Sequence, residues 1–205
     1  MPLSSSFDFS IPPVGIDGNT KMSPLAIAIV EAENRDSWSW FMEELMNIVG
    51  PPRGLTFMSD RQKGLLQTFE DVLEGADHRF CVRHMYENFK KKFKGLQLKI
   101  ELWNAAKAYD EVEFNKHMQK IKDINGDAYD WLVKVPFYLW ARAHFPTTSK
   151  CDLVINNMCE SWNSVILKAR EKPVITILEW IQKHLLRRFK KKKIFYVIIQ
   201  WIGVP

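Results

Sequence analysis

The hydrophobic and polar positions divide the chain into a first part with short apolar runs and a second part with helical spacing. Pro24–Val30 is an almost continuous apolar run, which predicts a strand in the interior of a sheet. Leu55–Asp60 is a second such run, and His78–Cys81 predicts one more short strand. Val14–Thr20 is expected to end a strand in a turn, because its Asp-Gly pair is typical of hairpins.

Two helices are expected among these strands. Asp36 or Ser37 is expected to cap the first helix, and its apolar side chains share one face: Trp38, Phe41, Leu45 and Ile48. The second helix is expected over Arg61–Glu74, directly after the strand that ends at Asp60. Strands that alternate with helices indicate an α/β fold for this part of the chain.

From Val82 onward, apolar positions recur at helical spacing. Pro136 is expected to kink one of these helices, because proline cannot donate the backbone hydrogen bond that a helix interior requires. Pro146–Ser149 is the clearest loop. The expected helices cover residues 83–93, 97–109, 111–124, 127–144, 152–169 and 174–192.

Charge is distributed unevenly between the two parts. The net charge is +5 over 205 residues, yet residues 1–80 hold 6 Lys and Arg against 12 Asp and Glu, and residues 81–205 hold 23 against 12. An acidic part followed by a basic part fits a carboxylate metal site beside a phosphate-binding surface. It fits an ordinary solvated surface almost as well.

Cysteine usage and the two ends bear on the compartment. Three cysteines without the spacing of a disulfide scaffold indicate a reducing environment. Met1–Ser6 has neither the basic nor the apolar region of a secretion signal. Ile194–Val204 is apolar but spans only about half of the ~20 residues that cross a membrane. Neither secretion nor a membrane partner is expected.

Asp60 is the first candidate for a chemical role. It ends an apolar run and begins a helix, and α/β folds present metal ligands and catalytic acids at such strand tips. Ser59 or Asp60 could instead simply cap the helix that follows. The segment alone leaves both interpretations open.

Glu160 is the second candidate. Asn156, Glu160 and Asn163 follow one another at spacings of four and three residues, with Asn157 beside them. On a helix this spacing places the three side chains on one face. If that face is buried, its polar groups need partners, which a metal ion or a nucleic-acid backbone would supply. A solvent-facing amphipathic helix is the alternative.

Two further patterns are weaker. Cys81 and His84 have the spacing of half a zinc site, but no second half is evident, so a structural role is favoured over zinc. A basic run near the end predicts either a nucleic-acid contact or nuclear-localisation patch or a solvated helix end. Its charged residues are Arg187, Arg188, Lys190, Lys191, Lys192 and Lys193.

The ordered series of these motifs resembles the transposases of Mutator-like elements (MULEs), which are known chiefly from plant genomes. The resemblance runs from about residue 14 to about residue 188. The segments that carry it are Val14-Gly15-Ile16-Asp17-Gly18-Asn19, Pro24-Leu25-Ala26, Glu31-x-Glu33-Asn34, Ser37-Trp38-x-Trp40-Phe41, Ser59-Asp60-Arg61-Gln62-Lys63-Gly64, Cys81-x-x-His84 with Asn88-Phe89, and Asn156-Asn157-x-x-Glu160-Ser161-Trp162-Asn163.

The resemblance implies a DDE transposase with an RNase H-like fold and a helical insertion before its last acid. Such enzymes cut and join DNA with three carboxylates that hold two divalent metal ions. Asp60 corresponds to the second acid and Glu160 to the third, while Cys81 and His84 correspond to a C-x-x-H element. Mg²⁺ or Mn²⁺ is the expected metal.

The resemblance also implies an organisation. The expected parts are a disordered leader (1–10), a partial RNase H-like core (11–95), a helical insertion (96–150), helices that carry the last acid (151–193) and an atypical apolar tail (194–205). No residue matches the family's first acid, since Asp17 corresponds to a different position and the motif around Asp8 does not match. Truncation at the N-terminus is therefore expected.

The expected function is that of a transposase catalytic fragment acting on DNA in the nucleus. It is expected to be inactive alone, and a homo-oligomer is left open. The alternative is a domesticated, transposase-derived nuclear module that binds DNA or regulates transcription without catalysis, for which the basic second part would suffice.

Overall fold

The computed structural model of the protein describes residues 8–9, 14–16, 22–24, 26, 28–30, 32, 34–50, 56–59, 65–147, 151–156 and 172–190. The chain divides into two compact units. One unit combines Met1–Glu33 with Asn157–Pro205, and the other is the continuous stretch Asn34–Asn156. Each unit is described below by itself.

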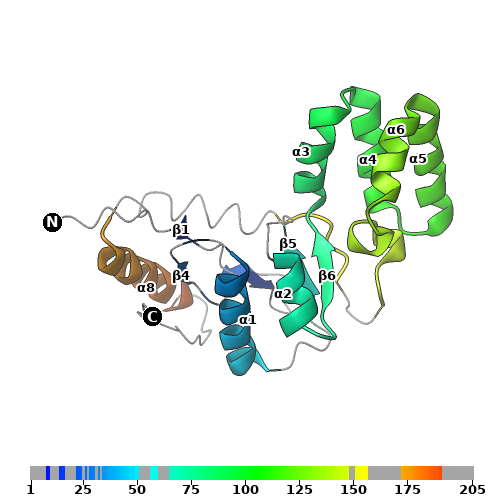
Figure 1. Cartoon of the computed structure of the whole chain (residues 1–205). Coiled ribbons are helices and arrows are strands. Elements are labelled where there is room, and N and C mark those ends of the chain that lie inside the picture. The colour runs from blue at the N-terminus through cyan, green and yellow to red at the C-terminus, as the bar shows by residue number, and fades with distance from the viewer. Residues whose placement is uncertain are drawn as a thin grey trace. The chain divides into compact units, whose positions relative to one another are not determined.

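Among its described residues, the first unit contains short antiparallel strand pairs and a long helix (Figure 1). β2 (Val14–Ile16) pairs with β3 (Met22–Pro24), as the predicted hairpin requires. β1 (Asp8–Phe9) pairs with β4 (Ile29–Val30), so two residues of the expected disordered leader form a strand. The helix is α8 (Val174–Lys190), close to the expected 174–192.

The prediction of one strand over Pro24–Val30 is wrong. β3 ends at Pro24 and β4 begins at Ile29, and the buried residues Ala26 and Ala28 between them belong to neither strand. The two strands have different partners, β2 and β1. Pro24 also lacks the N–H group that would continue a ladder. The apolar run therefore reflects burial rather than a single strand.

The second unit begins with a small parallel α/β element. β5 (Thr56–Ser59) and β6 (Asp77–Phe80) run parallel, and α2 (Leu65–Val72) lies between them in sequence. α1 (Arg35–Val49) packs beside α2 (Figure 1). Parallel strands need a crossover connection of this kind. The pair is compatible with the predicted α/β class, while the described residues as a whole are mostly helical.

The cap and the exposed end of α1 differ from expectation. Asn34 caps the helix instead of Asp36 or Ser37, because its Oδ1 accepts a hydrogen bond of 2.9 Å from the N–H of Ser37. Of the predicted apolar face, Trp38, Phe41 and Leu45 are buried, whereas Ile48 is 44% exposed.

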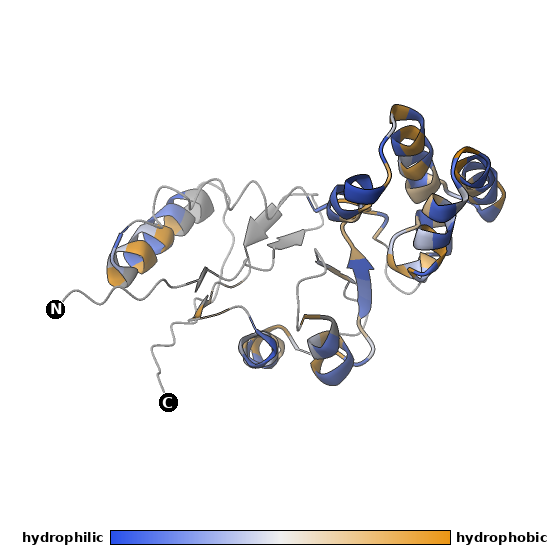
Figure 2. Ribbon diagram, turned by 45° about the horizontal axis from the view of Figure 1, so that its top comes forward, coloured by the Kyte–Doolittle hydropathy of each residue, from blue (hydrophilic) through white to orange (hydrophobic). Residues whose placement is uncertain are grey.

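The rest of the second unit is a helical block built from α3 (Val82–Lys92), α4 (Leu96–Lys107), α5 (Glu111–Ile124) and α6 (Gly126–Val133). The helices have hydrophobic and hydrophilic sides (Figure 2), and the hydrophobic sides form one core. Its fully buried members include Val82, Met85, Phe89, Leu102, Phe114, Ile121, Leu132 and Trp140.

Pro136 ends a helix rather than kinking it, so the prediction of a helix over 127–144 is wrong in its second half. α6 stops at Val133, and two 3₁₀ turns follow, η1 (Phe137–Leu139) and η2 (Arg142–His144). The missing N–H group and the ring of proline are incompatible with the interior of a helix.

The prediction of a helix over 152–169 is wrong for its first residues. Asp152–Asn156 is not helical, and the N–H of Val82 donates a 2.9 Å hydrogen bond to the carbonyl of Val154, which is buried. This contact at the start of α3 holds the segment in a non-helical conformation. The remainder of the predicted helix, residues 157–169, lies outside the described residues.

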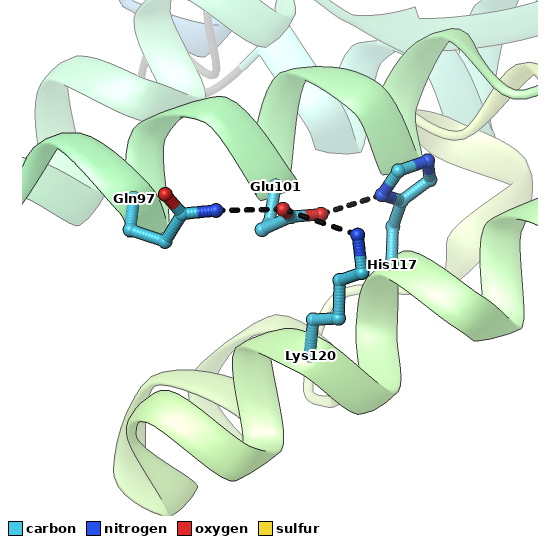
Figure 3. Close-up of polar contacts among 4 residues, drawn as sticks. All are labelled: Gln97, Glu101, His117 and Lys120. Carbon is cyan, nitrogen blue, oxygen red and sulfur yellow. Dashed lines mark hydrogen bonds and ion pairs between the residues drawn. The ribbon is translucent and has the colours of Figure 1, made fainter.

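A buried carboxylate joins α4 to α5 (Figure 3). Glu101 of α4 is 3% exposed and accepts hydrogen bonds from Gln97 Nε2 at 2.8 Å and His117 Nδ1 at 2.5 Å. Lys120 Nζ lies 3.5 Å from Oε1, the oxygen that also accepts from Gln97. Buried charges are tolerated when they are paired in this way.

Among the described helices, none is both long and apolar enough to cross a membrane.

Candidate functional site

The carboxyl ends of β5 and β6 form the edge of the sheet that Asp60 follows in sequence. Ser59 and Phe80 are paired in register as the last residues of their strands. Ligand sites of open α/β sheets lie at the carboxyl ends of parallel strands. Asp60 follows Ser59 directly in sequence, although Asp60 itself lies outside the described residues.

Ser59 and His78 fix this end of the sheet from within. Ser59 is buried, and its Oγ lies 2.8 Å from Nε2 of His78. The imidazole of His78 stacks on the ring of Phe69, with centroids 4.0 Å apart, and meets Phe80 edge to face. Burial lowers the pKa of His78 to about 4. His78 is therefore neutral near pH 7, and it ties β6 to the residue that precedes Asp60.

Cys81 lies where three segments of the second unit meet. Its N–H donates a 2.8 Å hydrogen bond to the carbonyl of Ser59, and its Sγ accepts one of 3.3 Å from the N–H of Asn156. The thiol is almost completely buried. The backbone that leads to Asp60 and the backbone that leads towards Glu160 are therefore both attached to this residue.

The thiol of Cys81 also interacts with His84. Burial raises the pKa of the thiol, but the side-chain hydrogen bond with His84, the hydrogen bond from Asn156 and the charge of His84 outweigh that effect, and the net pKa is lowered. The structure thus shows a Cys–His pair that joins the end of β6 to the first turn of α3. A structural role in place of zinc stays a prediction for this pair.

Two arginines hold the segment that precedes Asn156. Arg79 of β6 is fully buried, and its Nη1 donates to the carbonyl of Cys151 while its guanidinium lies 3.7 Å from the ring centroid of Phe145. Arg142 Nε donates a 3.0 Å hydrogen bond to the carbonyl of Asp152. These contacts attach the segment 151–156 to β6 and to the 3₁₀ turn η2.

The structure describes only part of the predicted site. Cys81, His84 and Asn156 are brought together, but Asn156 is not on a helix, so the predicted helix face that includes it is wrong at that residue. Arg187 is exposed on α8, and Arg188 and Lys190 belong to the same helix. The predicted residues outside the described ones are Asp60, Asn157, Glu160, Asn163, Lys191, Lys192 and Lys193.

The donor chemistry differs between the two candidate metal sites. Asp60 and Glu160 would offer carboxylate oxygens, which Mg²⁺ and Mn²⁺ prefer. Cys81 and His84 are already hydrogen-bonded, and within the described part of the chain no group of three His, Cys, Asp or Glu could hold a metal ion. That zinc does not bind at Cys81 and His84 stays a prediction.

His78 and Arg79 are the structurally important residues that sequence reasoning did not single out. Both lie in the run that predicted a strand, where their polar side chains interrupt the apolar pattern. A charged residue in a short buried strand is a signal of paired burial. The sequence therefore indicates that these residues are paired. It does not indicate with which residues, because Cys151, the partner of Arg79, and Ser59, the partner of His78, are distant in sequence.

The α/β element with polar residues at its carboxyl end suits a protein that binds ligands at that edge. Residues 6–88 match the family model of the MULE transposase domain. The match covers β1 to β6 and includes Asp60, Cys81 and His84, whereas Glu160 lies beyond it. It supports a transposase-related function and an interaction with DNA. No curated protein matches the chain.

Proposed function

We propose that the chain is a segment of a DDE-type transposase catalytic domain with an RNase H-like core, in which Asp60 and Glu160 are the second and third acids. The observation that carries the proposal is the position of Asp60. It follows the last residue of a parallel strand, inside the region that matches the MULE transposase domain. Open α/β sheets bind their ligands at this edge, so an acid here is suited to hold a metal ion.

The described residues would position the acids rather than react. Cys81 is hydrogen-bonded to Ser59, next to Asp60, and to Asn156, which precedes Glu160 by four positions. Neutral His78 fixes the hydroxyl of Ser59, the residue before Asp60, and adds no positive charge there. Asp60 and Glu160 would hold Mg²⁺ or Mn²⁺, which when bound supplies a Lewis acid for attack on a phosphodiester.

Two acids give an incomplete metal site. No residue of the chain corresponds to the family's first acid, so fewer carboxylates are available than two-metal catalysis requires. We therefore expect the chain alone to cleave DNA little or not at all.

The alternative is a nuclear module derived from a transposase, which binds DNA or regulates transcription without catalysis. The excess of basic residues after residue 80 favours DNA binding. This function requires neither Asp60 nor Glu160. It would place part of the contact on the basic run that begins at Arg187 on α8.

An assay on supercoiled DNA tests both functions. The purified chain is incubated with Mg²⁺ or Mn²⁺, beside the variants Asp60→Asn and Glu160→Gln. The matched control is Glu70→Gln, an exposed carboxylate on α2. We expect little nicking by any of the four proteins. Robust nicking by the wild type that is lost in both Asp60→Asn and Glu160→Gln would refute the expected inactivity but support the role of the two acids. Nicking that survives in both variants would refute the proposed catalytic site. Salt-sensitive DNA binding that survives Asp60→Asn but falls when Lys190–Lys193 are neutralised would favour the alternative.

A further inference from the structure

The hairpin of α3 and α4 carries a concentrated positive charge. Residues 82–107 hold seven Lys and Arg but only two Glu. One of these acids, Glu101, is buried against His117 and Lys120 of α5 (Figure 3). The other, Glu87, is bound to Lys90 at 2.5 Å. The basic residues are Arg83, Lys90, Lys91, Lys92, Lys94, Lys99 and Lys107.

The neighbouring helices of the same unit have the opposite balance. Residues 108–133, which form α5 and α6, hold three Lys against six Asp and Glu. The helical block is thus basic on its α3–α4 side and acidic on its α5–α6 side, although it shares one hydrophobic core. A solvated surface without a partner gives no reason for this separation, whereas a polyanionic partner does.

Aromatic rings hold several of these lysines in place. Lys90 Nζ and Lys99 Nζ lie 5.8 Å and 5.5 Å from the ring centroid of Tyr86, which therefore joins the charges of α3 to those of α4. Lys107 Nζ lies 5.3 Å from the ring centroid of Trp103. Cation–π contacts of this kind orient a flexible lysine while its charge stays accessible.

We propose that the exposed face of the α3–α4 hairpin, formed by Lys94, Lys99 and Lys107 with Tyr86 and Trp103, binds the phosphate backbone of duplex DNA. Lys99 and Lys107 are separated by two turns of α4, or about 12 Å along its axis, so they can meet different phosphates of one strand. The contact is electrostatic and independent of sequence, because lysine binds phosphate as a point charge.

The same geometry favours a duplex over a single strand. Proteins that bind single strands expose aromatic faces on which bases stack. Here Tyr86 and Trp103 are half-buried, and lysine ammonium groups lie over their faces. The rings therefore hold cations instead of offering a stacking surface. The choice of DNA among polyanions rests on the proposed function, whereas the basic surface itself does not.

The test compares two triple variants of the full chain that lose the same charge. One is Lys94→Gln with Lys99→Gln and Lys107→Gln, and the control is Lys116→Gln with Lys122→Gln and Lys134→Gln, on α5 and after α6. All six side chains are exposed, and Lys122 also lies over a ring, that of Tyr129. Binding to a short DNA duplex is measured by fluorescence anisotropy at several salt concentrations.

We expect the α3–α4 variant to lose at least about 10-fold in affinity, and its slope of log affinity against log salt to fall by about 3, one unit for each phosphate contact. The control should lose much less. Equal losses in both variants, or unchanged binding by the first, would overturn the proposal. Replacing the same three lysines with Arg should restore binding.

A measurement on the unaltered chain does not depend on the folding of any variant. Lysine acetylation in the presence of duplex DNA, read by mass spectrometry, should protect Lys99 and Lys107 but not Lys116 and Lys122. Equal protection of all four lysines would contradict the proposed DNA-binding surface. Tighter binding to a single strand would refute the duplex mode, and equal competition by polyglutamate would indicate an acidic protein instead of DNA. None of these results depends on Asp60 or Glu160, so the failure of this proposal and the failure of the proposed function can be told apart.

Discussion

At the scale of single residues, His78 and Cys81 determine how the end of the small parallel sheet is held. Cys81 connects Ser59 to Asn156 through two hydrogen bonds, and His78 connects the same Ser59 to β6 through its side chain. A buried polar group that loses its partner costs about 1–3 kcal/mol. The charge state of His78 therefore affects the segment that leads to Asp60.

The lowered pKa of His78 makes stability depend on pH. An unfolded histidine titrates near 6.5, and the folded one titrates at about 4. Below pH 6.5 the unfolded chain binds a proton that the folded chain does not, so stability falls with pH until about pH 4. Between pH 7 and pH 5 this loss is on the order of 2 kcal/mol.

The measurement is urea unfolding of the wild type and of His78→Gln at pH 7 and pH 5. The free energy of unfolding should fall more steeply for the wild type, because the variant lacks this titrating group. Parallel pH dependence in the two proteins would show that His78 is not the buried neutral base that the structure describes.

At the scale of elements, the pairing of α4 with α5 depends on one buried carboxylate. Burial raises the pKa of Glu101, but the hydrogen bond from His117 and the charges of Lys120 and His117 lower it more, and the net pKa is below its usual value. Its contribution to stability is therefore present above about pH 4.5 and is lost as the pH falls through its folded pKa.

Glu101→Gln should lower the free energy of unfolding at pH 7 by roughly 1–3 kcal/mol, because charge-assisted hydrogen bonds from His117 and Lys120 are weakened. Asp130→Asn on α6 is the matched control. Its exposed side chain should contribute less than about 0.5 kcal/mol. The loss at Glu101 should diminish in acid, and a loss that stays constant below pH 4 would contradict the charged pair.

The helices and strands that could be predicted are those whose ends depend on neighbouring residues in the sequence. The helix over 111–124 begins where it was predicted, because Oδ1 of Asp110 accepts a 2.8 Å hydrogen bond from the N–H of Glu113. Residues 152–156 are apolar enough to predict a helix, yet a distant partner at Val82 holds them in another conformation. Pro24–Val30 is divided because its two ends pair with different strands.

The candidate site divides in the same way. The strand before Asp60 could be predicted from its own apolar run, and the Cys81–His84 pair from its spacing. The contacts of Cys81 with Asn156 and of Arg79 with Cys151 join residues more than 70 positions apart. Nothing in the local pattern specifies such long-range pairs, which depend on how the whole unit packs.

At the scale of the whole molecule, an acidic part that matches the MULE transposase domain is followed by a basic part rich in helices. The match contains Asp60, whereas Glu160 and the α4 lysines lie after it. The proposed function therefore joins a residue of the matched region to one outside it. We expect Asp60 and Glu160 each to be a ligand of divalent metal.

Titration of the full chain with Mn²⁺, followed by electron paramagnetic resonance of the free ion, tests this claim most directly. We expect the wild type and Glu70→Gln to bind Mn²⁺ with the same affinity. Asp60→Asn and Glu160→Gln should each lose at least about 10-fold in affinity, because mutation of residues that only support the ligands of a metal site already lowers metal affinity by that factor. Wild-type affinity in either single variant would contradict the role of the replaced acid as a metal ligand.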